Sequence, residues 1–286
     1  MGCLLPLAFP AVPMSAGPVS SSRTDPITSL GMGLVWLTRG VGEFALFTLR
    51  TLGWLFSRWP GRSQLLLAMT QVAVQSVVVV SLTGAFIGMV IAVQTYDQFR
   101  FMQMETQLGA AVNISIFKEL GPVLAAIMLA GRVGCAMAAE IGTMKITEQI
   151  DALWALGAAP LHYLVVPRFL ACMLMTPLLV VCADAAGAAG GWVFATQLLD
   201  INDTHYWMHC VGYIHAFDIF GGVFKSVFFG AVIALNACYR GFHCGAGAQG
   251  VGQAATEAFV LSFLGILVLD FFLSTFLNGL YDVMYR

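Results

Sequence analysis

The sequence predicts an all-α, polytopic membrane protein, and three observations lead to this fold class. Hydrophobic residues make up 59% of the 286 residues, charged residues make up 10%, and the mean hydropathy is +0.85. An ordinary soluble domain carries about 25% charged residues, so a soluble globular enzyme is excluded. The 13 basic and 15 acidic residues give a net charge of -2, which excludes a nucleic-acid binder with a basic surface. A hydrocarbon core about 30 Å thick needs roughly 20 residues per helix, so this length accommodates about five or six spans.

The N-terminal region predicts a tail followed by a helix in the membrane interface. Residues 1–26 are expected to be disordered, because four prolines interrupt the first 22 residues and no charged side chain occurs there. Residues 27–62 interleave basic side chains with many aromatic ones, a composition typical of an interfacial helix. A true span is disfavoured here, because Arg39, Glu43 and Arg50 would all lie in hydrocarbon.

Five apolar stretches predict the membrane spans. They cover about 72–95, 108–138, 164–199, 219–239 and 258–281. Gly84 and Gly88 in the first span form a GxxxG pair, which lets two helices approach closely. The third stretch is long enough to tilt in the bilayer, or to kink at Pro167 or Pro177.

The distribution of basic residues predicts the orientation. Basic side chains gather in the N-terminal segment, around 132–168 and at Arg240, whereas residues 200–218 contain none. Because basic loops tend to remain in the cytoplasm, we expect the N-terminus and the segments 139–160 and 240–257 on the cytoplasmic side. The C-terminus is expected outside.

Ionisable side chains interrupt these spans: Lys118 and Glu119 in the second, Asp184 in the third, Lys225 in the fourth and Asp270 in the fifth. Each costs several kcal/mol at the bilayer centre unless it is paired or hydrated. Adjacent helical residues point about 100° apart, so Lys118 and Glu119 need partners on other helices. Lys225 and Asp270 supply the opposite signs. The expected topology gathers these groups in the outer half of the bilayer, which predicts a polar-lined cavity that opens away from the cytoplasm. Structural ion pairing between helices is the alternative, and the two are compatible.

The segment 139–157 predicts a short amphipathic helix between the second and third spans. Its apolar face comprises Ile146, Ile150, Leu153, Trp154 and Gly157. Its other face comprises Lys145, Glu148, Gln149 and Ala152. Such a helix either lies flat on the membrane or inserts into a groove on a partner, and the periodicity leaves both open.

Catalytic and metal motifs are missing from the sequence. A P-loop needs Gly directly before Lys, but Phe, Met and Phe precede the three lysines. No GxSxG or HExxH occurs either, so we expect no catalytic site. The segment 200–218 carries His205, His209, Cys210 and His215. A solvated loop is preferred there over a metal site, because no metalloenzyme pattern accompanies these residues.

One long stretch carries a family resemblance. Residues 118–153 read KELGPVLAAIMLAGRVGCAMAAEIGTMKITEQIDAL, and residues 84–96 read GAFIGMVIAVQTY. Together they resemble the MlaE family, the permease subunits of bacterial ABC-type lipid transporters, which also has plastid relatives. PRF at 167–169, KSVFFG at 225–230 and LDFFL at 269–273 fit the same pattern. The resemblance covers roughly 30–284, and the first 25 or so residues depart from it.

The resemblance implies partners and a role for the cytoplasmic segment. It implies a homodimer driven by two copies of a separate cytoplasmic ATPase, which holds the ATP and Mg²⁺, so no cofactor is expected in this chain. It also implies an MCE-domain substrate-binding protein on the outer face and a STAS-domain protein on the ATPase. The segment 139–157 resembles the family's coupling helix. The residues expected to couple to the ATPase are Glu140, Met144, Lys145, Thr147, Glu148, Gln149 and Asp151.

The function implied by this resemblance is ATP-driven transport of phospholipids or related lipids, in a bacterial inner membrane. Two copies would form an outward-open cavity lined by apolar side chains of the first, second and fifth spans. Lys118, Glu119, Lys225 and Asp270 would lie near the head group or hold the helices together. One alternative is an ion-coupled secondary transporter that uses these charges as a proton relay. Another is a lipid-modifying enzyme built on Asp203, His205 and His209.

Overall fold

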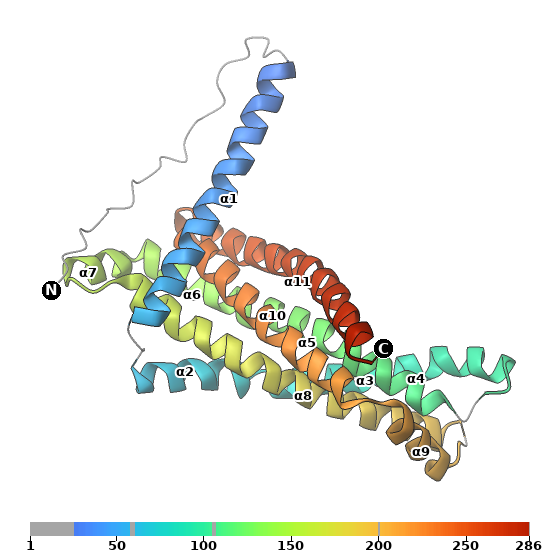
Figure 1. The fold of residues 1–286 in the computed structure, drawn as a ribbon. Coiled ribbons are helices and arrows are strands. Elements are labelled where there is room, and N and C mark those ends of the chain that lie inside the picture. The colour runs from blue at the N-terminus through green and yellow to red at the C-terminus, as the bar shows by residue number, and fades with distance from the viewer. Residues whose placement is uncertain (1–25, 58–60, 105–106, 200, 286) are drawn as a thin grey trace. The chain divides into compact units, whose positions relative to one another are not determined.

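The computed structural model describes residues 26–57, 61–104, 107–199 and 201–285 of the chain (Figure 1). The predicted tail therefore lies, except for Pro26, outside the described residues. The chain divides into two units, residues up to Leu46 and residues from Phe47 onward.

Helix α1 (Pro26–Ser57) runs through the boundary between the two units. In the first unit, Arg39 Nε and Glu43 Oε1 form an exposed ion pair of 3.0 Å one helical turn apart. In the second unit, the buried ring of Phe47 packs against the rings of Tyr239 and Phe242, with centroids 5.6 and 6.1 Å away. The helix ends five residues before the predicted end of this segment, and its place in the membrane interface stays a prediction.

The second unit contains the five predicted spans as five helical stretches of at least 27 residues. The first stretch joins α2 (Arg62–Ala73) to α3 (Val77–Phe101), and the third joins η4 (Leu161–Val165) to α8 (Val166–Gln197). The fourth and fifth are α10 (Ala216–Phe242) and α11 (Gly247–Tyr285). Four of them extend beyond the predicted apolar cores without falling short at either end, because helices that leave the bilayer can continue with polar side chains; the third begins three residues before and ends two residues before the predicted bounds. The chain is thus an all-α, multi-pass membrane protein over its described residues.

The second span is built from five consecutive helical segments. They are α4 (Leu108–Ser115), η2 (Ile116–Leu120), α5 (Gly121–Leu129), η3 (Ala130–Gly134) and α6 (Cys135–Ile146). The segments η2 and η3 are π-helical, so each widens the helix locally. Such widened turns often occur at functional sites, and η2 contains both Lys118 and Glu119.

Glycines bring α3 and α8 into backbone contact. A Cβ on Gly84 would overlap the carbonyl oxygen of Ala183, and one on Gly88 would overlap that of Gly187. Gly190 approaches the carbonyl of Ala85 in the same way. The GxxxG pair of the first span therefore packs within the chain, where it fixes α3 against α8.

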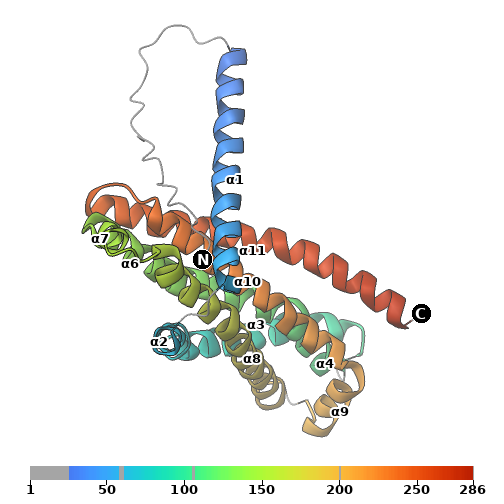
Figure 2. The same cartoon turned by 60° about the vertical axis from the view of Figure 1, so that its left-hand side comes forward.

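Helix α10 contacts α6, α8 and α11, as Figure 2 shows from a second direction. Glycines again permit the close approach: Gly222 lies against the carbonyl of Phe117, and Gly230 against that of Cys172. This central position buries Lys225, which faces the second and fifth spans.

The predicted helix at 139–157 is wrong in form, because a turn divides it. Helix α6 ends at Ile146, and α7 (Gln149–Ala155) begins after Thr147 and Glu148. Glu148 has a φ of 58°, the left-handed conformation that commonly ends a helix. The apolar pattern therefore extends across a break, and Gly157, at a φ of 73°, lies beyond the end of α7.

Two further connections are also more helical than expected. Residues 203–213 form α9 (Asp203–Tyr213) rather than a loop, and Asn202 caps its first turn by accepting a hydrogen bond of 2.9 Å from the Thr204 N–H. The predicted link at 240–257 shrinks to residues 243–246 between α10 and α11.

Consecutive spans run in opposite directions. Helix α7 and the α10–α11 turn lie at one end of the spans, whereas α9 and the end of α3 lie at the other (Figures 1 and 2). We call these the α7 end and the α9 end. The predicted cytoplasmic segments 139–160 and 240–257 thus gather at the α7 end.

Candidate functional site

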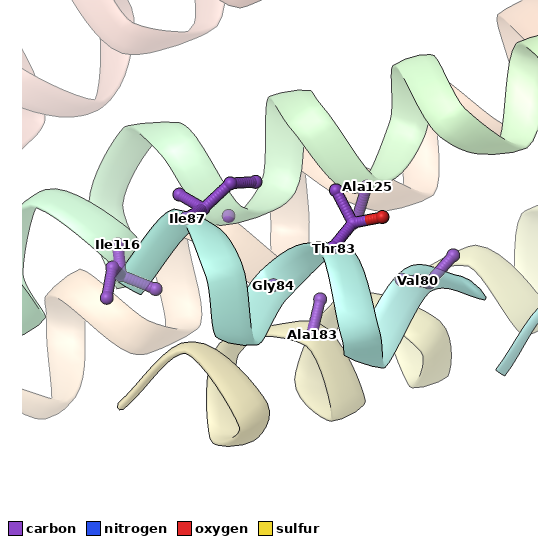
Figure 3. A pocket seen from close by; sticks show the side chains of 8 residues that line it. Val80, Thr83, Gly84, Ile87, Ile116, Ala125 and Ala183 are labelled. Atoms are coloured by element: carbon purple, nitrogen blue, oxygen red, sulfur yellow. The ribbon is translucent and has the colours of Figure 1, made fainter. Parts of the chain in front are cut away.

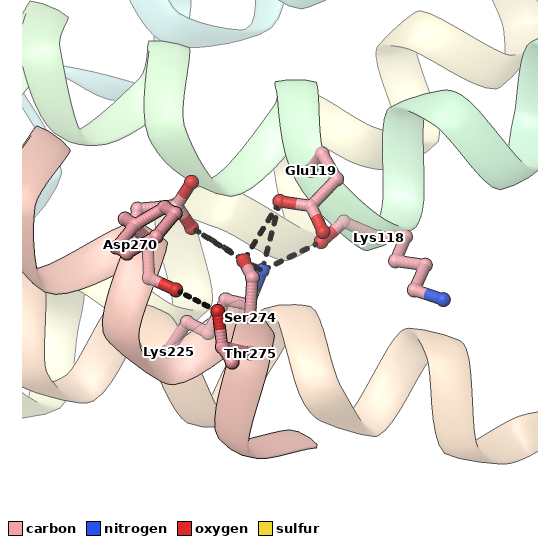
Figure 4. Close-up of polar contacts among 7 residues, drawn as sticks. Lys118, Glu119, Lys225, Asp270, Ser274 and Thr275 are labelled. Atoms are coloured by element: carbon pink, nitrogen blue, oxygen red, sulfur yellow. Dashed lines mark hydrogen bonds and ion pairs between the residues drawn. The ribbon is translucent and has the colours of Figure 1, made fainter. Parts of the chain in front are cut away.

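A buried ammonium group joins three spans in a polar cluster (Figure 4). Lys225 Nζ of α10 lies 2.9 Å from Glu119 Oε2 of the second span and 3.2 Å from Asp270 Oδ1 of α11. It also donates a hydrogen bond of 2.6 Å to Ser274 Oγ, one turn beyond Asp270. The Lys225 side chain is 2% exposed, and these acceptors replace the water that burial removes. We call Glu119, Lys225, Asp270 and Ser274 the Lys225 cluster.

The local sequence of the second span prepares an acceptor for this ammonium group. Pro122 has no N–H, so it cannot donate to the carbonyl of Lys118 four residues earlier. Lys225 Nζ donates to that carbonyl over 3.2 Å. The Lys-Glu-Leu-Gly-Pro sequence therefore supplies both a carboxylate and a carbonyl to the same ammonium.

The charges of the cluster do not cancel. One ammonium faces two carboxylates, and the Ser274 hydroxyl lies 3.1 Å from Glu119 Oε2 and 3.4 Å from Asp270 Oδ1. A hydroxyl has one proton, so it serves one of these two acceptors at a time. The Glu119 side chain is also 39% exposed. The cluster can therefore accept further hydrogen bonds or a second cation at Glu119.

A shallow hollow borders the cluster, with room for little more than a water molecule. Its lining comprises Lys118, Glu119, Phe217, Asp218, Gly221, Gly222, Lys225, Ser274, Leu277 and Asn278. Phe217 and Asp218 belong to the first turn of α10, so the hollow lies toward the α9 end. Its sides come from the second, fourth and fifth spans.

Lys118 does not take part in the ion pairing that the sequence suggested. Its ammonium group points away from the Lys225 cluster in Figure 4, and only its carbonyl contacts Lys225. Among the described residues, no carboxylate lies within ion-pair distance of Lys118 Nζ. The side chain instead lines the shallow hollow and supplies a positive charge there.

A second, apolar hollow lies between the first three spans (Figure 3). Its lining comprises Val80, Thr83, Gly84, Ile87, Ile116, Gly121, Ala125 and Ala183. It therefore differs from the expected acyl-chain cavity, which included the fifth span and required two copies of the chain. Asp184, next to Ala183, packs its buried carboxyl group against Gly121, and its Oδ1 has no hydrogen-bond partner among the described residues.

The residues expected to couple to an ATPase divide into two groups. Glu140 and Lys145 bond within the chain: Glu140 Oε2 lies 2.9 Å from Arg168 Nη2 of α8, and Lys145 Nζ donates to the carbonyl of Cys244 over 3.0 Å. Thr147 Oγ1 donates to the carbonyl of Thr143 one turn earlier, and Met144 is half-buried.

The second group surrounds α7 and is exposed, as Glu140, Lys145 and Thr147 of the first group also are. It comprises Glu148, Gln149 and Asp151. Trp154 and Leu156, with 42% and 81% exposure, join them at the α7 end. Sequence reasoning placed Trp154 on an apolar face and missed Arg168, Cys244 and Ser274, whose roles depend on contacts between distant helices.

The side chains of α9 hold this helix against α4. Tyr206 and Cys210 are buried, and Asn113 Nδ2 donates to Tyr206 Oη over 3.2 Å and to Cys210 Sγ over 2.9 Å. Burial raises the pKa of Tyr206 to about 12. His215 caps the first turn of α10 together with Asp218. The side chains of His205 and His209 lie outside the described residues, and among the described ones no group of three His, Cys, Asp or Glu could hold a metal.

Comparison with known proteins identifies a family. A family model described as permease MlaE matches residues 65–276. A probable ABC transporter permease protein of Rickettsia felis is 37% identical over 246 residues, which cover 86% of this chain and 95% of the relative. One from Synechocystis is 42% identical over 206 residues, covering 72% of this chain and 78% of the relative. The intermembrane phospholipid transport system permease protein MlaE of Haemophilus influenzae is 34% identical over 259 residues, covering 88% and 97%.

Proposed function

Because this chain belongs to the MlaE permease family, we propose that it is the membrane subunit of an ABC transporter that moves phospholipids or related lipids between membranes. Its relatives in Rickettsia felis and Synechocystis are named as ABC transporter permeases, and the one in Haemophilus influenzae is named for intermembrane phospholipid transport. The bacterial inner membrane is the proposed location.

The proposed assembly contains two copies of this chain and a separate ATPase that binds ATP and Mg²⁺ in the cytoplasm. An MCE-domain protein would deliver or receive lipid at the outer face, and a STAS-domain protein would bind the ATPase. The exposed residues Glu148, Gln149 and Asp151 would meet the ATPase at the α7 end. Glu140 and Lys145 are exposed as well, but because they bond within the chain they would support this contact surface as much as form it.

The observation that carries the lipid assignment is a hollow with both charge signs inside otherwise apolar spans. Lys118 offers a cation to a phosphate group, and the exposed side of Glu119 offers a carboxylate to a head-group amine. A phospholipid would place its head group at the mouth of this shallow hollow and its acyl chains against the apolar faces of neighbouring helices, since the bilayer core accepts only apolar chains. ATP binding in the partner would move α7 and close the cavity between the two copies.

The deciding experiment is reconstitution of the chain with the ATPase that co-purifies with it. We expect transfer of a fluorescent phospholipid between vesicles to require ATP hydrolysis and to continue when a protonophore removes the proton gradient. A complex whose ATPase binds but cannot hydrolyse ATP is the matched control. Transfer driven by a proton gradient without ATP would contradict the proposal and favour a secondary transporter. A chain that purifies without an ATPase, even after crosslinking, would contradict it as well.

A further inference from the structure

The end of α6 packs firmly against the turn between α10 and α11, and we call this contact the joint. We propose that Lys145 is the positioning residue that transmits movement of α7 through the joint to α11. The inference rests on the proposed function, because it assumes that an ATPase moves α7. It assigns to Lys145 a contact inside the chain in place of a contact with the ATPase.

The centre of the joint is Cys244, in the turn between α10 and α11. Its carbonyl accepts a hydrogen bond of 3.0 Å from Lys145 Nζ, and its thiol donates to the carbonyl of Gly142 over 3.4 Å. A Cβ on Gly142 would lie 3.3 Å from Cys244 Sγ and 3.5 Å from Val251 Cγ2. The last turn of α6 is therefore in contact with this turn, with no room between them.

Further contacts fix the first turns of α11 to its neighbours. Cys135 Sγ of α6 donates to the carbonyl of Ala255 over 3.4 Å, and Arg240 Nη1 of α10 lies 3.0 Å from Glu257 Oε2. Gly241 of α10 lies so close to Ile141 of α6 that a Cβ there would be 2.7 Å from the Ile141 Cβ. These contacts make α6 and the inner parts of α10 and α11 one packed unit.

Helix α11 extends from this unit to the Lys225 cluster. It is continuous from Gly247 to Tyr285 and contains no proline. Asp270 lies 23 residues beyond Gly247, which is about 35 Å along the helix at 1.5 Å per residue. The helix around and beyond Asp270 is open, with Phe271 and Phe272 exposed by 68% and 64%. Beyond this unit, a small tilt of α11 away from α10 would therefore grow along the helix into a larger displacement of Asp270 and Ser274 relative to Lys225.

The direct test is removal of the Lys145 hydrogen bond in the reconstituted transporter. Lys145→Met keeps the length of the side chain and removes its donors, whereas Lys145→Arg keeps a charged donor. We expect Lys145→Met to assemble with the ATPase and hydrolyse ATP, but to move about two- to fivefold less lipid per ATP, because Lys145 is exposed and water replaces part of the lost hydrogen bond. Lys145→Arg should restore most of the ratio, and the melting temperature should change little in either variant.

A second test asks whether the joint stays closed during transport. A Cβ on Gly142 would lie 3.5 Å from the Cys244 Cβ, within the range of a disulfide, so Gly142→Cys can be crosslinked to the native Cys244. Gly142→Ser is the matched control for the added side chain. Burial raises the pKa of the Cys244 thiol, although Lys145 opposes this rise, so oxidation is carried out at alkaline pH and confirmed by mass spectrometry.

The expected result is that the oxidised Gly142→Cys transporter moves as much lipid per ATP as its reduced form. A joint that opens would lose transport on oxidation and recover it on reduction, which would overturn the proposal. An unchanged lipid-to-ATP ratio in Lys145→Met would overturn it too, as would failure of the disulfide to form. The unmodified complex separates the Lys145 proposal from the proposed function. If the unmodified complex shows no ATP-driven lipid transfer, the proposed function itself is refuted.

Discussion

At the scale of single residues, Lys225 depends on acceptors from two other spans. Replacement by Met removes the ammonium group and leaves the carboxylates of Glu119 and Asp270 without their cation. Removing one partner of a fully buried ion pair costs about 3–5 kcal/mol, and we expect a smaller loss here because the Glu119 and Asp270 side chains are 39% and 19% exposed. We therefore expect Lys225→Met to lower the melting temperature of the purified chain in detergent, as measured by thermal unfolding.

Lys118→Met is the matched control for this prediction. Both variants remove an ammonium group from the same region, but among the described residues Lys118 Nζ has no carboxylate within ion-pair distance. We expect its melting temperature to remain close to that of the unmodified chain. A drop as large as that of Lys225→Met would mean that loss of positive charge in this region, rather than loss of pairing, destabilises the protein.

The sequence predicted the members of the ion-paired group better than their roles. Charges of opposite sign in different spans were sufficient to expect that Glu119, Lys225 and Asp270 would meet, because none is stable alone in hydrocarbon. Which member of the Lys118–Glu119 pair enters the cluster depends on the π-helical turn η2, which changes the direction of each side chain. Ser274 was missed, because a serine on an apolar helix has no distinct signal without its neighbours.

At the scale of elements, the close contact between α3 and α8 depends on glycines, which have no side chain to separate the two backbones. A Cβ on Gly88 would overlap the carbonyl oxygen of Gly187, and a backbone carbonyl cannot rotate away as a side chain can. Overpacking of this kind costs about 1–3 kcal/mol. We expect Gly88→Ala to lower the melting temperature, whereas Gly279→Ala in α11, where a Cβ would meet nothing within 4 Å, should leave it unchanged or slightly higher. Equal effects of the two substitutions would contradict this account of the contact.

The turn between α6 and α7 determines where an ATPase can bind. Glu148 occupies this turn in a left-handed conformation with its side chain exposed. If it contacts the ATPase, Glu148→Lys should abolish lipid-stimulated ATPase activity of the complex while the chain stays folded, because the charge at the contact is reversed. Asp97→Lys makes the same charge change at an exposed position near the α9 end and should keep the stimulation. Normal stimulation in Glu148→Lys would remove this residue from the contact.

This turn also marks the limit of periodicity as a guide to elements. The five spans were predictable, because long apolar stretches leave few alternatives in a membrane. The pattern from Ile146 to Gly157 fits one helix face, yet Glu148 interrupts it in a conformation that a glutamate rarely adopts. Helix α9 was missed because its short sequence is partly polar and gives no clear helical pattern. The contacts that hold it, from Asn113 to Tyr206 and Cys210, join residues far apart in the sequence.

At the scale of the whole molecule, the five alternating spans together predict which side of the membrane each connection faces. The proposed function requires α7 in the cytoplasm, so the α7 end and the α9 end must face opposite sides of the membrane. Exposed positions near the α7 end include Thr147 and Ala246, and those near the α9 end include Gln103 and Gly212. Cysteine substitutions at these four positions can report the side of the membrane on which each one lies.

A membrane-impermeant maleimide applied to intact spheroplasts should label Gln103→Cys and Gly212→Cys at once, and Thr147→Cys and Ala246→Cys only after permeabilisation. The unmodified chain, whose described cysteines are buried or half-buried, measures the background. The reversed pattern would place α7 outside, where no cytoplasmic ATPase could reach it, and would refute the proposed coupling while preserving the fold. Labelling of Thr147 and Ala246 from opposite sides would refute the arrangement of spans itself, because α10 joins α11 at the same end at which α6 joins α7.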